Sequence, residues 1–292
     1  MGQGKIAELA RRGVVAVAGP EAETFLNGLV TNDLAAIPAQ GAGYGGLLTP
    51  QGKILFDFIV YRDRDQFLFD LPAEAVADFV KRLRFYKLRA LADIEDVSAT
   101  YKVVAAWGVD VPPAVGGLVA TDPRLKELGF RLVVAARRPV AADSFTVVDE
   151  AAYDAHRIDL GVPEGGIDFA YGEVFPHDAD MDQLVGVAFD KGCFIGQEVV
   201  SRMEHRGTAR RRIVQILAAS PIPPAGAEIV AGDKPVGTIA SSTDHAGLAL
   251  VRLDRVKDAI DAGVPLLARG MPVDIEIPDW AEFRLPETEA RE

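Results

Sequence analysis

The sequence predicts an α+β protein that ends in a small β-barrel. Over residues 1–210, short runs rich in β-branched and aromatic side chains alternate with helical patterns, which favours an α+β region built from two interleaved subdomains. This region lacks the G-x-G-x-x-G and G-K-[ST] elements of dinucleotide and P-loop sites. Residues 211–280 change to short strands between Pro/Gly turns, a pattern typical of a small barrel. Residues 281–292 are predicted to be a tail.

Each predicted element has its own local signal. Residues 14–17 are mostly β-branched and predict a strand, and Gly19-Pro20 predicts the start of a helix, because proline suits a helical position that needs no amide hydrogen. Residues 50–53, Pro-Gln-Gly-Lys, are a turn by composition, so the strands on either side are predicted to form a hairpin. The remaining ranges are strands at 44–49, 54–61, 67–71, 101–107 and 130–135, helices at 72–91, 149–161 and 196–205, and barrel strands at 213–218, 236–241, 248–253 and 273–277.

Composition limits the class of protein. The 292 residues carry a formal net charge of −12 and include 49% hydrophobic residues, enough for a sizeable core. An acidic chain argues against bulk nucleic-acid binding, because phosphates are held by Lys and Arg. No apolar run approaches the roughly 20 residues that span a bilayer, and the N-terminal residues have no signal-peptide core. We therefore expect a soluble cytoplasmic protein without membrane contact.

The chain is organised around its only cysteine, Cys193, in the segment 190–198. The helix predicted after it places Cys193 near a helix N-terminus, where the backbone dipole and Lys191 would both favour the thiolate. The alternative is a small buried side chain, the commonest state of a free cysteine. One cysteine excludes an internal disulfide, a cysteine zinc site and a self-contained iron–sulfur cluster, which needs about four thiolates. A dimer or a partner would have to supply the missing ligands.

Residues 191–198, Lys-Gly-Cys-Phe-Ile-Gly-Gln-Glu, resemble the signature of the YgfZ-type proteins. These are folate-binding relatives of the glycine-cleavage T-protein, an aminomethyltransferase, and they help to mature iron–sulfur enzymes. The resemblance implies a T-protein-like folate-binding fold with a C-terminal β-barrel. It also implies tetrahydrofolate or a derivative as cofactor, and iron–sulfur assembly proteins or client enzymes as partners. Cys193 and Lys191 would be the reactive residues, with Gln197 and Glu198 shaping the turn beside the cofactor.

Asp57 is a carboxylate within the almost wholly apolar strand 54–61. Burying a carboxylate without a partner is costly, so Asp57 must be hydrogen-bonded or functional, unless one face of this strand is partly exposed. The run resembles the T-protein strand in which an acidic pair faces the folate, reduced here to Phe56-Asp57. The resemblance implies a catalytic and folate-binding role for Asp57. The missing second acid puts aminomethyl transfer in doubt more than it does folate binding.

A second family segment is residues 156–161, in which Arg157 precedes Asp159 and a glycine. In the T-protein branch the acidic residue contacts the folate pteridine, so the resemblance implies cofactor binding by Arg157 and Asp159. A carboxylate can accept two parallel hydrogen bonds from the amino and ring N–H edge of a pterin, as it does from a guanidinium group. The alternative is an ordinary surface aspartate paired with Arg157.

Two charged segments lie on either side of the cysteine. The cations between residues 202 and 212 either suit a helix end and a strand start or form a landing site for an anion, such as a polyglutamylated tail or an acidic partner. They are Arg202, His205, Arg206, Arg210, Arg211 and Arg212. The acidic segment before the cysteine could hold a metal, but a solvated loop is the simpler interpretation, and no metal site is predicted. Its members are His177, Asp178, Asp180 and Asp182.

Three functions are compatible with these residues. The first is a tetrahydrofolate-binding accessory protein for the assembly or repair of iron–sulfur clusters, in which Cys193 transiently holds iron, sulfide or a mixed disulfide. The second is a folate-dependent aminomethyl or one-carbon transferase, in which Asp57 orients the folate or the amine. The third is a non-catalytic, folate-regulated scaffold. The sequence favours the first, so a classical enzyme is not expected.

Overall fold

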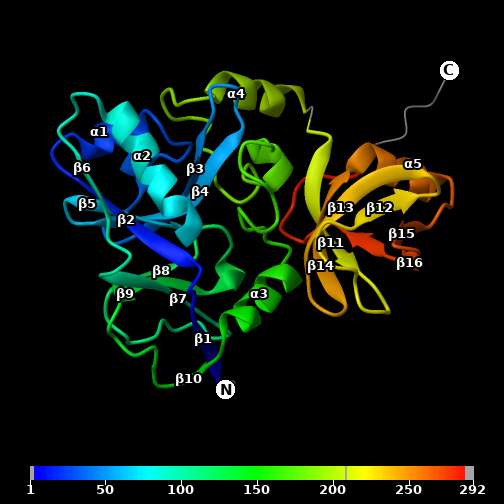
Figure 1. Ribbon diagram of the computed structural model, residues 1–292, viewed down its shortest axis with the longest axis horizontal. Coiled ribbons are helices and arrows are strands. Elements are labelled where there is room, and N and C mark those ends of the chain that lie inside the picture. The colour runs from blue at the N-terminus through cyan, green and yellow to red at the C-terminus, as the bar shows by residue number, and fades with distance from the viewer. Residues whose placement is uncertain (1–2, 208, 287–292) are drawn as a thin grey trace. The chain divides into compact units, whose positions relative to one another are not determined.

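A computed structural model describes residues 3–207 and 209–286 of the chain (Figure 1). The chain forms two compact units, each assembled from segments that are distant in the sequence. Unit 1 comprises residues 3–154 and 184–199, and unit 2 comprises residues 155–183 and 200–286. The segment that carries Cys193 therefore belongs to unit 1. The limits at residues 210 and 280 stay a prediction, and the last six residues of the expected tail lie outside the described residues.

The first sheet of unit 1 has five strands in the order β3-β4-β5-β2-β6, and all its neighbours are antiparallel. The strands are β2 (Arg12–Ala18), β3 (Ala42–Leu48), β4 (Ile54–Asp63), β5 (Gln66–Pro72) and β6 (Asp93–Asp96). The predicted hairpin is confirmed, because β3 and β4 pair around a turn in which Gly52 has a φ of 82°.

The second sheet of unit 1 has the order β10-β1-β7-β9-β8. Its strands are β1 (Gly4–Glu8), β7 (Tyr101–Trp107), β8 (Leu118–Thr121), β9 (Phe130–Ala135) and β10 (Phe145–Val147). Only the β1–β10 pair is parallel among these neighbours. The strands predicted at 101–107 and 130–135 coincide with β7 and β9. Buried side chains from this sheet, including Ile6, Val104 and Leu132, form a core of their own.

The first sheet is covered by a helix that packs on it through an aromatic cluster. The helices of this part are α1 (Ala22–Asn27) and α2 (Val76–Lys87), with 3-10 turns η1 (Leu34–Ala36), η2 (Ala73–Ala75) and η3 (Lys126–Leu128). Helix α3 (Glu150–Asp159) begins in unit 1, and its residues from Ala155 onward belong to unit 2. The ring of Phe79 on α2 lies 5.3 Å from that of Phe56 and 5.6 Å from that of Phe58, between centroids. Because side chains alternate along a strand, Asp57 projects from the opposite face of β4. The helix predicted at 72–91 is shorter, since residues 73–75 form η2 and Leu88 leaves the helical region with a φ of 47°.

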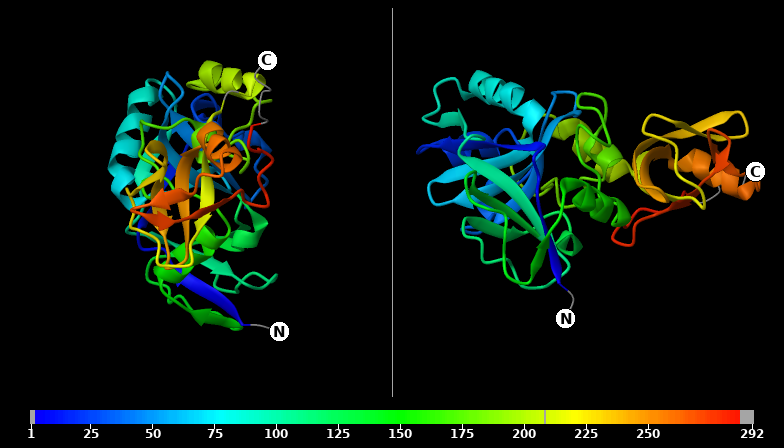
Figure 2. Two further views of the ribbon diagram at one scale, coloured as in Figure 1. Left: turned by 90° about the vertical axis from the view of Figure 1, so that its right-hand side faces the viewer. Right: turned by 60° about the horizontal axis from the view of Figure 1, so that its bottom comes forward.

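Unit 2 contains the predicted C-terminal β-barrel, a seven-stranded sheet in the order β16-β15-β12-β13-β14-β11-β17 (Figure 2). The strands are β11 (Arg211–Leu217), β12 (Glu228–Ala231), β13 (Lys234–Ser242), β14 (Ala246–Arg252), β15 (Leu266–Ala268), β16 (Met271–Pro272) and β17 (Asp274–Glu276). Helix α5 (Leu253–Asp261) was not predicted, and neither were the short strands β12, β15 and β16. The first residue of α5, Leu253, directly follows β14 and falls within the predicted strand 248–253, which hid the change of structure. Leu253, Val256 and Ala259 bury one face of α5 against the barrel core.

Unit 2 also contains the second half of α3, the 3-10 turn η4 (Pro176–Ala179), most of α4 (Gln197–Arg206) and the segment after the barrel. This last segment packs within unit 2, because the indole N–H of Trp280 donates to the carbonyl of Leu160 at 2.7 Å. The Arg212 guanidinium also stacks 4.8 Å from the centre of the Phe283 ring. Within the described ranges, no helix has both the length and the apolar character that a membrane crossing requires.

Candidate functional site

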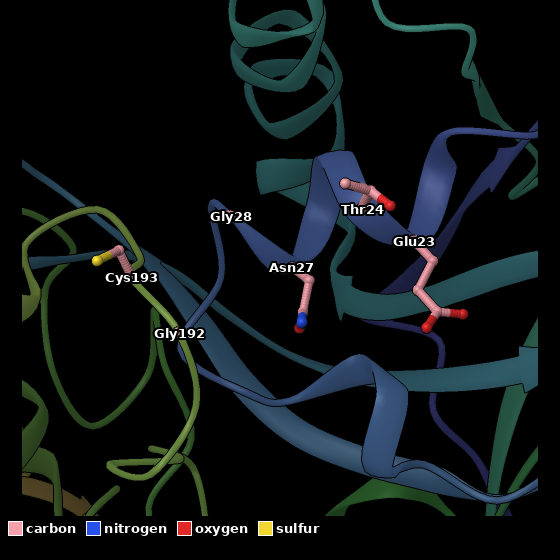
Figure 3. A pocket seen from close by; sticks show the side chains of 6 residues that line it. All are labelled: Glu23, Thr24, Asn27, Gly28, Gly192 and Cys193. Atoms are coloured by element: carbon pink, nitrogen blue, oxygen red, sulfur yellow. The ribbon is translucent and has the colours of Figure 1, made fainter.

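Cys193 lies on an exposed loop of unit 1, between a segment that runs beside Thr31 and the start of α4. It lines a pocket of about 240 Å³ together with Gly192 and residues of the α1 region, namely Glu23, Thr24, Asn27 and Gly28. Figure 3 shows the Cys193 sulfur pointing away from Asn27 and Glu23. The thiol is thus accessible, and the alternative of a small buried side chain does not apply.

The helix after the cysteine starts too late to act on it directly. α4 begins at Gln197, so Cys193 lies before its first turn, and the field of a helix end falls off within that turn. The side chain of Glu198 is exposed and that of Gln197 is half-buried. Their cofactor role stays a prediction.

Lys191 fastens this loop to the end of α1. Its ammonium group donates to Asn27 Oδ1 at 3.0 Å, to the carbonyl of Val30 at 2.9 Å and to the carbonyl of Asn32 at 2.5 Å. An ammonium group has three N–H donors, so these oxygens occupy all of them. Burial lowers the pKa of Lys191 to about 8, and Asp33 acts in the opposite direction. The geometry makes Lys191 a positioning residue for the loop.

The other side of the loop rests on the β3–β4 turn. Gly196 has a φ of 81°, and a β-carbon added there would lie 2.6 Å from the carbonyl oxygen of Thr49 and 3.0 Å from the α-carbon of Gly52. Only glycine allows the two backbones to approach so closely. Gly196 and Lys191 therefore hold the loop at both ends, with Cys193 between them.

Thr31 ties the preceding segment to β3. Its hydroxyl donates to the carbonyl of Gly186 at 2.6 Å and accepts the amide of Gly46 at 2.8 Å. Its carbonyl accepts the amide of Ala188 at 2.9 Å. The sequence reasoning did not identify Thr31, Asn27 or Asn32 as partners of the cysteine loop. No local signal identifies them, because these contacts join residues more than 150 positions apart.

Asp57 is buried in unit 1 with 3% of its surface exposed. Its carboxylate accepts the hydroxyl of Tyr44 at 3.1 Å, so the alternative of a partly exposed strand face is wrong. Burial raises the pKa of Tyr44, the negative charge of Asp57 adds to this, and Arg124 opposes it. Tyr44 also lines a pocket of about 360 Å³. Asp57 thus lies one hydrogen bond behind the wall of a cavity.

A buried ion-pair network continues from this point. Asp70 is fully buried and accepts from Arg12 at 2.5 Å and from Arg131 at 2.8 Å. Arg131 and Arg124 both donate to the hydroxyl of Tyr153 at 3.0 Å. The sequence held one signal for it, since Asp70 interrupts the apolar strand 67–71 just as Asp57 interrupts its own strand.

That network also includes Asp122, in a segment that reads as an ordinary turn in the sequence. Arg124 donates to Asp122 at 3.0 and 2.8 Å, and both side chains are almost completely buried. Burial acts to raise the pKa of Asp122, but Arg124 outweighs it and the pKa is lowered. The ion pair therefore fixes this turn inside unit 1.

Arg157 and Asp159 lie on α3, in unit 2. Arg157 is buried and donates to Asp168 at 2.5 Å, with Glu164 at 3.5 Å. Asp159 is exposed, and its backbone carbonyl accepts Gln215 Nε2 at 2.8 Å. Asp57 and Asp159 thus belong to different units, and the pterin role of Arg157 and Asp159 stays a prediction.

The acidic and basic segments of unit 2 bind each other. Arg211 donates to Asp178 at 2.5 Å, and Arg212 holds Asp182 in a bidentate pair at 2.5 and 2.8 Å. The predicted solvated loop is wrong, because His177, Asp178 and Asp180 are buried. Burial raises the pKa of Asp180, Asp182 adds to this, and Arg212 opposes it. Two of the six cations proposed as an anion site are therefore occupied by carboxylates.

One group in unit 2 has the donor set of a cation site. Ligand atoms of His177, Asp182 and Glu204 lie within 4.8 Å of one another. The imidazole Nε2 of His177 is 3.0 Å from Glu204 Oε2, and Asp182 is already bound by Arg212. One of the three members of this group is therefore already paired with a positive charge.

Comparison with known proteins identifies the fold. The GCVT N-terminal domain family matches residues 3–144, and the CAF17 C-terminal beta-barrel domain matches residues 210–283. The crystal structure of the glycine cleavage system aminomethyltransferase T from Bartonella henselae superposes with a TM-score of 0.75. This superposition covers 98% of the present chain and 88% of the other, at 18% identity. The predicted T-protein-like fold with a C-terminal barrel is confirmed.

Curated relatives carry the name iron–sulfur cluster assembly factor IBA57, mitochondrial. The homologue from Mycosarcoma maydis is 35% identical over 75% of this chain, and the human protein is 29% identical over 92% of it. The chain spans 59% of the length of the fungal relative and 83% of the human one. These names are of the IBA57 type, and the YgfZ-type label stays a prediction. The names of the relatives also contradict the predicted cytoplasmic location, since each relative is a mitochondrial protein.

Proposed function

We propose that this chain, which joins a GCVT N-terminal domain to a CAF17-type barrel, is an iron–sulfur cluster assembly factor. The observation that carries the proposal is the accessible thiol of Cys193 on a loop anchored at both ends. The similarity to IBA57-type assembly factors supports the same role. In this role Cys193 supplies one thiolate ligand to iron.

The anchoring of the loop suits a metal ligand. A ligand held by a rigid backbone loses little conformational freedom when it binds, so positioning costs less free energy. Lys191 and Gly196 provide that rigidity on either side of Cys193. A cluster takes about four protein ligands, so one thiolate from this chain must be complemented by thiolates from a partner.

Replacing Cys193 by Ser is expected to abolish cluster binding without lowering the stability of unit 1, because the side chain is exposed. The protein is mixed anaerobically with ferric iron, sulfide and glutathione, so that two ferric ions and two sulfide ions form the oxidised cluster without a further oxidant and the glutathione thiolates complete the coordination. The wild type is expected to gain the visible absorption of a cluster and the Cys193→Ser variant is not. The neighbouring variant Gly192→Ala serves as control, because a β-carbon there meets no atom within 4 Å. Equal absorption in the wild type and Cys193→Ser would remove the thiol from the mechanism.

Tetrahydrofolate is a second proposal, supported by the similarity of residues 3–144 to the GCVT N-terminal domain and by the pocket lined by Tyr44, whose hydroxyl donates to Asp57. Phe56 belongs to the aromatic core, so Asp57 is the residue of this pair that can act on a ligand. Calorimetry with tetrahydrofolate is expected to show binding that Asp57→Asn weakens at least about tenfold, the effect of losing a charge-assisted hydrogen bond. Asp159→Asn tests the other predicted contact. Absence of binding by the wild type at millimolar ligand would contradict the folate proposal.

A further inference from the structure

An exposed apolar patch lies at the C-terminal end of α2 and in the loop after it. Phe85, Leu88 and Leu91 expose 70%, 87% and 63% of their surface, and we call these three residues the α2 patch. A pocket of about 450 Å³ opens beside it, with Leu88 and Phe25 among its lining residues. Grouped exposed apolar side chains of this size typically mark a surface that another molecule covers.

Leu88 combines two unfavourable features. Its backbone has a φ of 47° and a ψ of −101°, a region that is strained for a residue with a β-carbon. Its side chain is the most exposed of the large apolar side chains in the described part of the chain. Neither the strain nor the exposure stabilises the isolated protein. Strained residues are characteristic of binding sites, where the displayed side chain has a use.

The α2 patch lies within a run of cations along the chain, although the whole chain has a net charge of −12. Residues 81–89 contain five cations and no acidic residue; the cations are Lys81, Arg82, Arg84, Lys87 and Arg89. The nearby carboxylate of Glu21 lines the same pocket, and it accepts the backbone amide of Leu91 at 2.6 Å. The surface thus has an apolar centre and a positive margin, the usual anatomy of a protein interface with an acidic partner.

This surface is continuous with the pocket at Cys193. Thr24 on α1 lines both the pocket beside the α2 patch and the pocket that contains Cys193. Both pockets belong to unit 1. A protein seated on the α2 patch would therefore reach Cys193 across the short helix α1.

We propose that the α2 patch and its cations are the docking surface for an acidic partner protein that brings thiolate ligands to Cys193. This inference rests on the proposed function, because the partner supplies the ligands that a single cysteine lacks. A second copy of the chain is a poorer occupant. A symmetric dimer would place the same five cations opposite each other, and like charges oppose such a contact.

A photo-crosslinker tests the surface in cells that express the full chain. Phe85→p-benzoylphenylalanine places the probe within the α2 patch, and Val111→p-benzoylphenylalanine is the matched control, because both positions are 70% exposed. We expect position 85, but not position 111, to yield an adduct that mass spectrometry identifies as an acidic, cysteine-bearing iron–sulfur protein. Combining the probe with Leu88→Gly is expected to reduce the adduct at least about tenfold, as for loss of an interface anchor. Glycine suits the backbone of position 88, so the fold should be retained.

The charge is tested by Arg89→Glu, which is expected to reduce the adduct, whereas Val111→Gly should leave it unchanged. An adduct with a second copy, with nucleic acid or with lipid would overturn the proposal, as would an adduct insensitive to Leu88→Gly. Cys193→Ser separates this proposal from the proposed function, because docking does not need the thiol. If the adduct forms and Cys193→Ser still binds a cluster, cluster ligation by Cys193 is refuted and the docking surface is retained. If Cys193→Ser loses cluster binding but no adduct forms at position 85, the docking surface is refuted and cluster ligation by Cys193 is retained.

Discussion

Replacing Asp70 by Asn is expected to lower the free energy of unfolding of unit 1 by about 3–5 kcal/mol, the usual cost of breaking a buried charge pair. Asp70 is fully buried between Arg12 and Arg131, whose side chains are 4% and 1% exposed. The substitution leaves two guanidinium groups facing a neutral amide. Burial acts to lower the pKa of Arg131, and Asp70, Tyr153 and Asp122 together raise it. A guanidinium group is not deprotonated in proteins, so the arginine stays charged when its counter-ion is removed.

Tryptophan fluorescence can assign this loss to one unit. Trp107 lies in unit 1 and Trp280 in unit 2, so in a Trp280→Phe background the urea transition of Trp107 reports unit 1. The control is Glu8→Gln in the same unit, where Glu8 pairs with Lys102 at 2.7 Å and is 46% exposed. Exposed pairs contribute at most about 1 kcal/mol. Equal shifts for Asp70→Asn and Glu8→Gln would contradict a stabilising role for the buried network.

Gly196→Ala is expected to destabilise the cysteine loop by about 2–4 kcal/mol, since strain at positive φ and a backbone clash add together. The new β-carbon would meet the carbonyl oxygen of Thr49 at 2.6 Å. A carbonyl fixed at the end of a strand cannot move aside cheaply, so the loop must move. The variant should lose cluster absorption in the glutathione assay even though the thiol of Cys193 is intact.

The matched control is Gly192→Ala on the same loop. Gly192 has no neighbour within 4 Å of its added β-carbon and does not have a positive φ, so this change should leave stability within about 0.5 kcal/mol, as for most surface substitutions. Urea unfolding followed by Trp107 and the cluster assay are run on both variants. If Gly196→Ala matches Gly192→Ala in both measurements, the close approach to the β3–β4 turn does not position Cys193.

Much of this fold can be predicted from the sequence because the residues of each strand or helix carry the pattern that identifies it. The strands β7 and β9 have the predicted limits, since each is a compact apolar run followed by polar or small residues. Helix α5 was not separated from β14 because Leu253 follows that strand with no Gly, Pro or other turn residue between them. Helix α2 ends early because Leu88 adopts a positive φ. A leucine in the sequence gives no indication of such a backbone conformation.

The candidate site is less predictable because its contacts join distant parts of the chain. The sequence identifies Cys193 as the only thiol and Asp57 as a carboxylate in an apolar strand. It does not reveal that Lys191 binds oxygens of residues 27–32, or that Arg211 and Arg212 neutralise an acidic segment. The acidic segment was predicted to be solvated because it carries several charges. It is buried because ion pairs with residues distant in the sequence neutralise those charges.

The lone sulfur on the surface of unit 1 has a consequence for how cargo would be kept and released. A complex that shares its metal between two different molecules forms at a rate set by the product of their concentrations. Dilution, or removal of the second molecule, then favours release of the metal, and the only bond of this chain that has to break is the one between the Cys193 thiolate and iron. Under the proposed function, the amount of metal bound would therefore follow the concentration of the second molecule, and the protein would pass metal on and not store it.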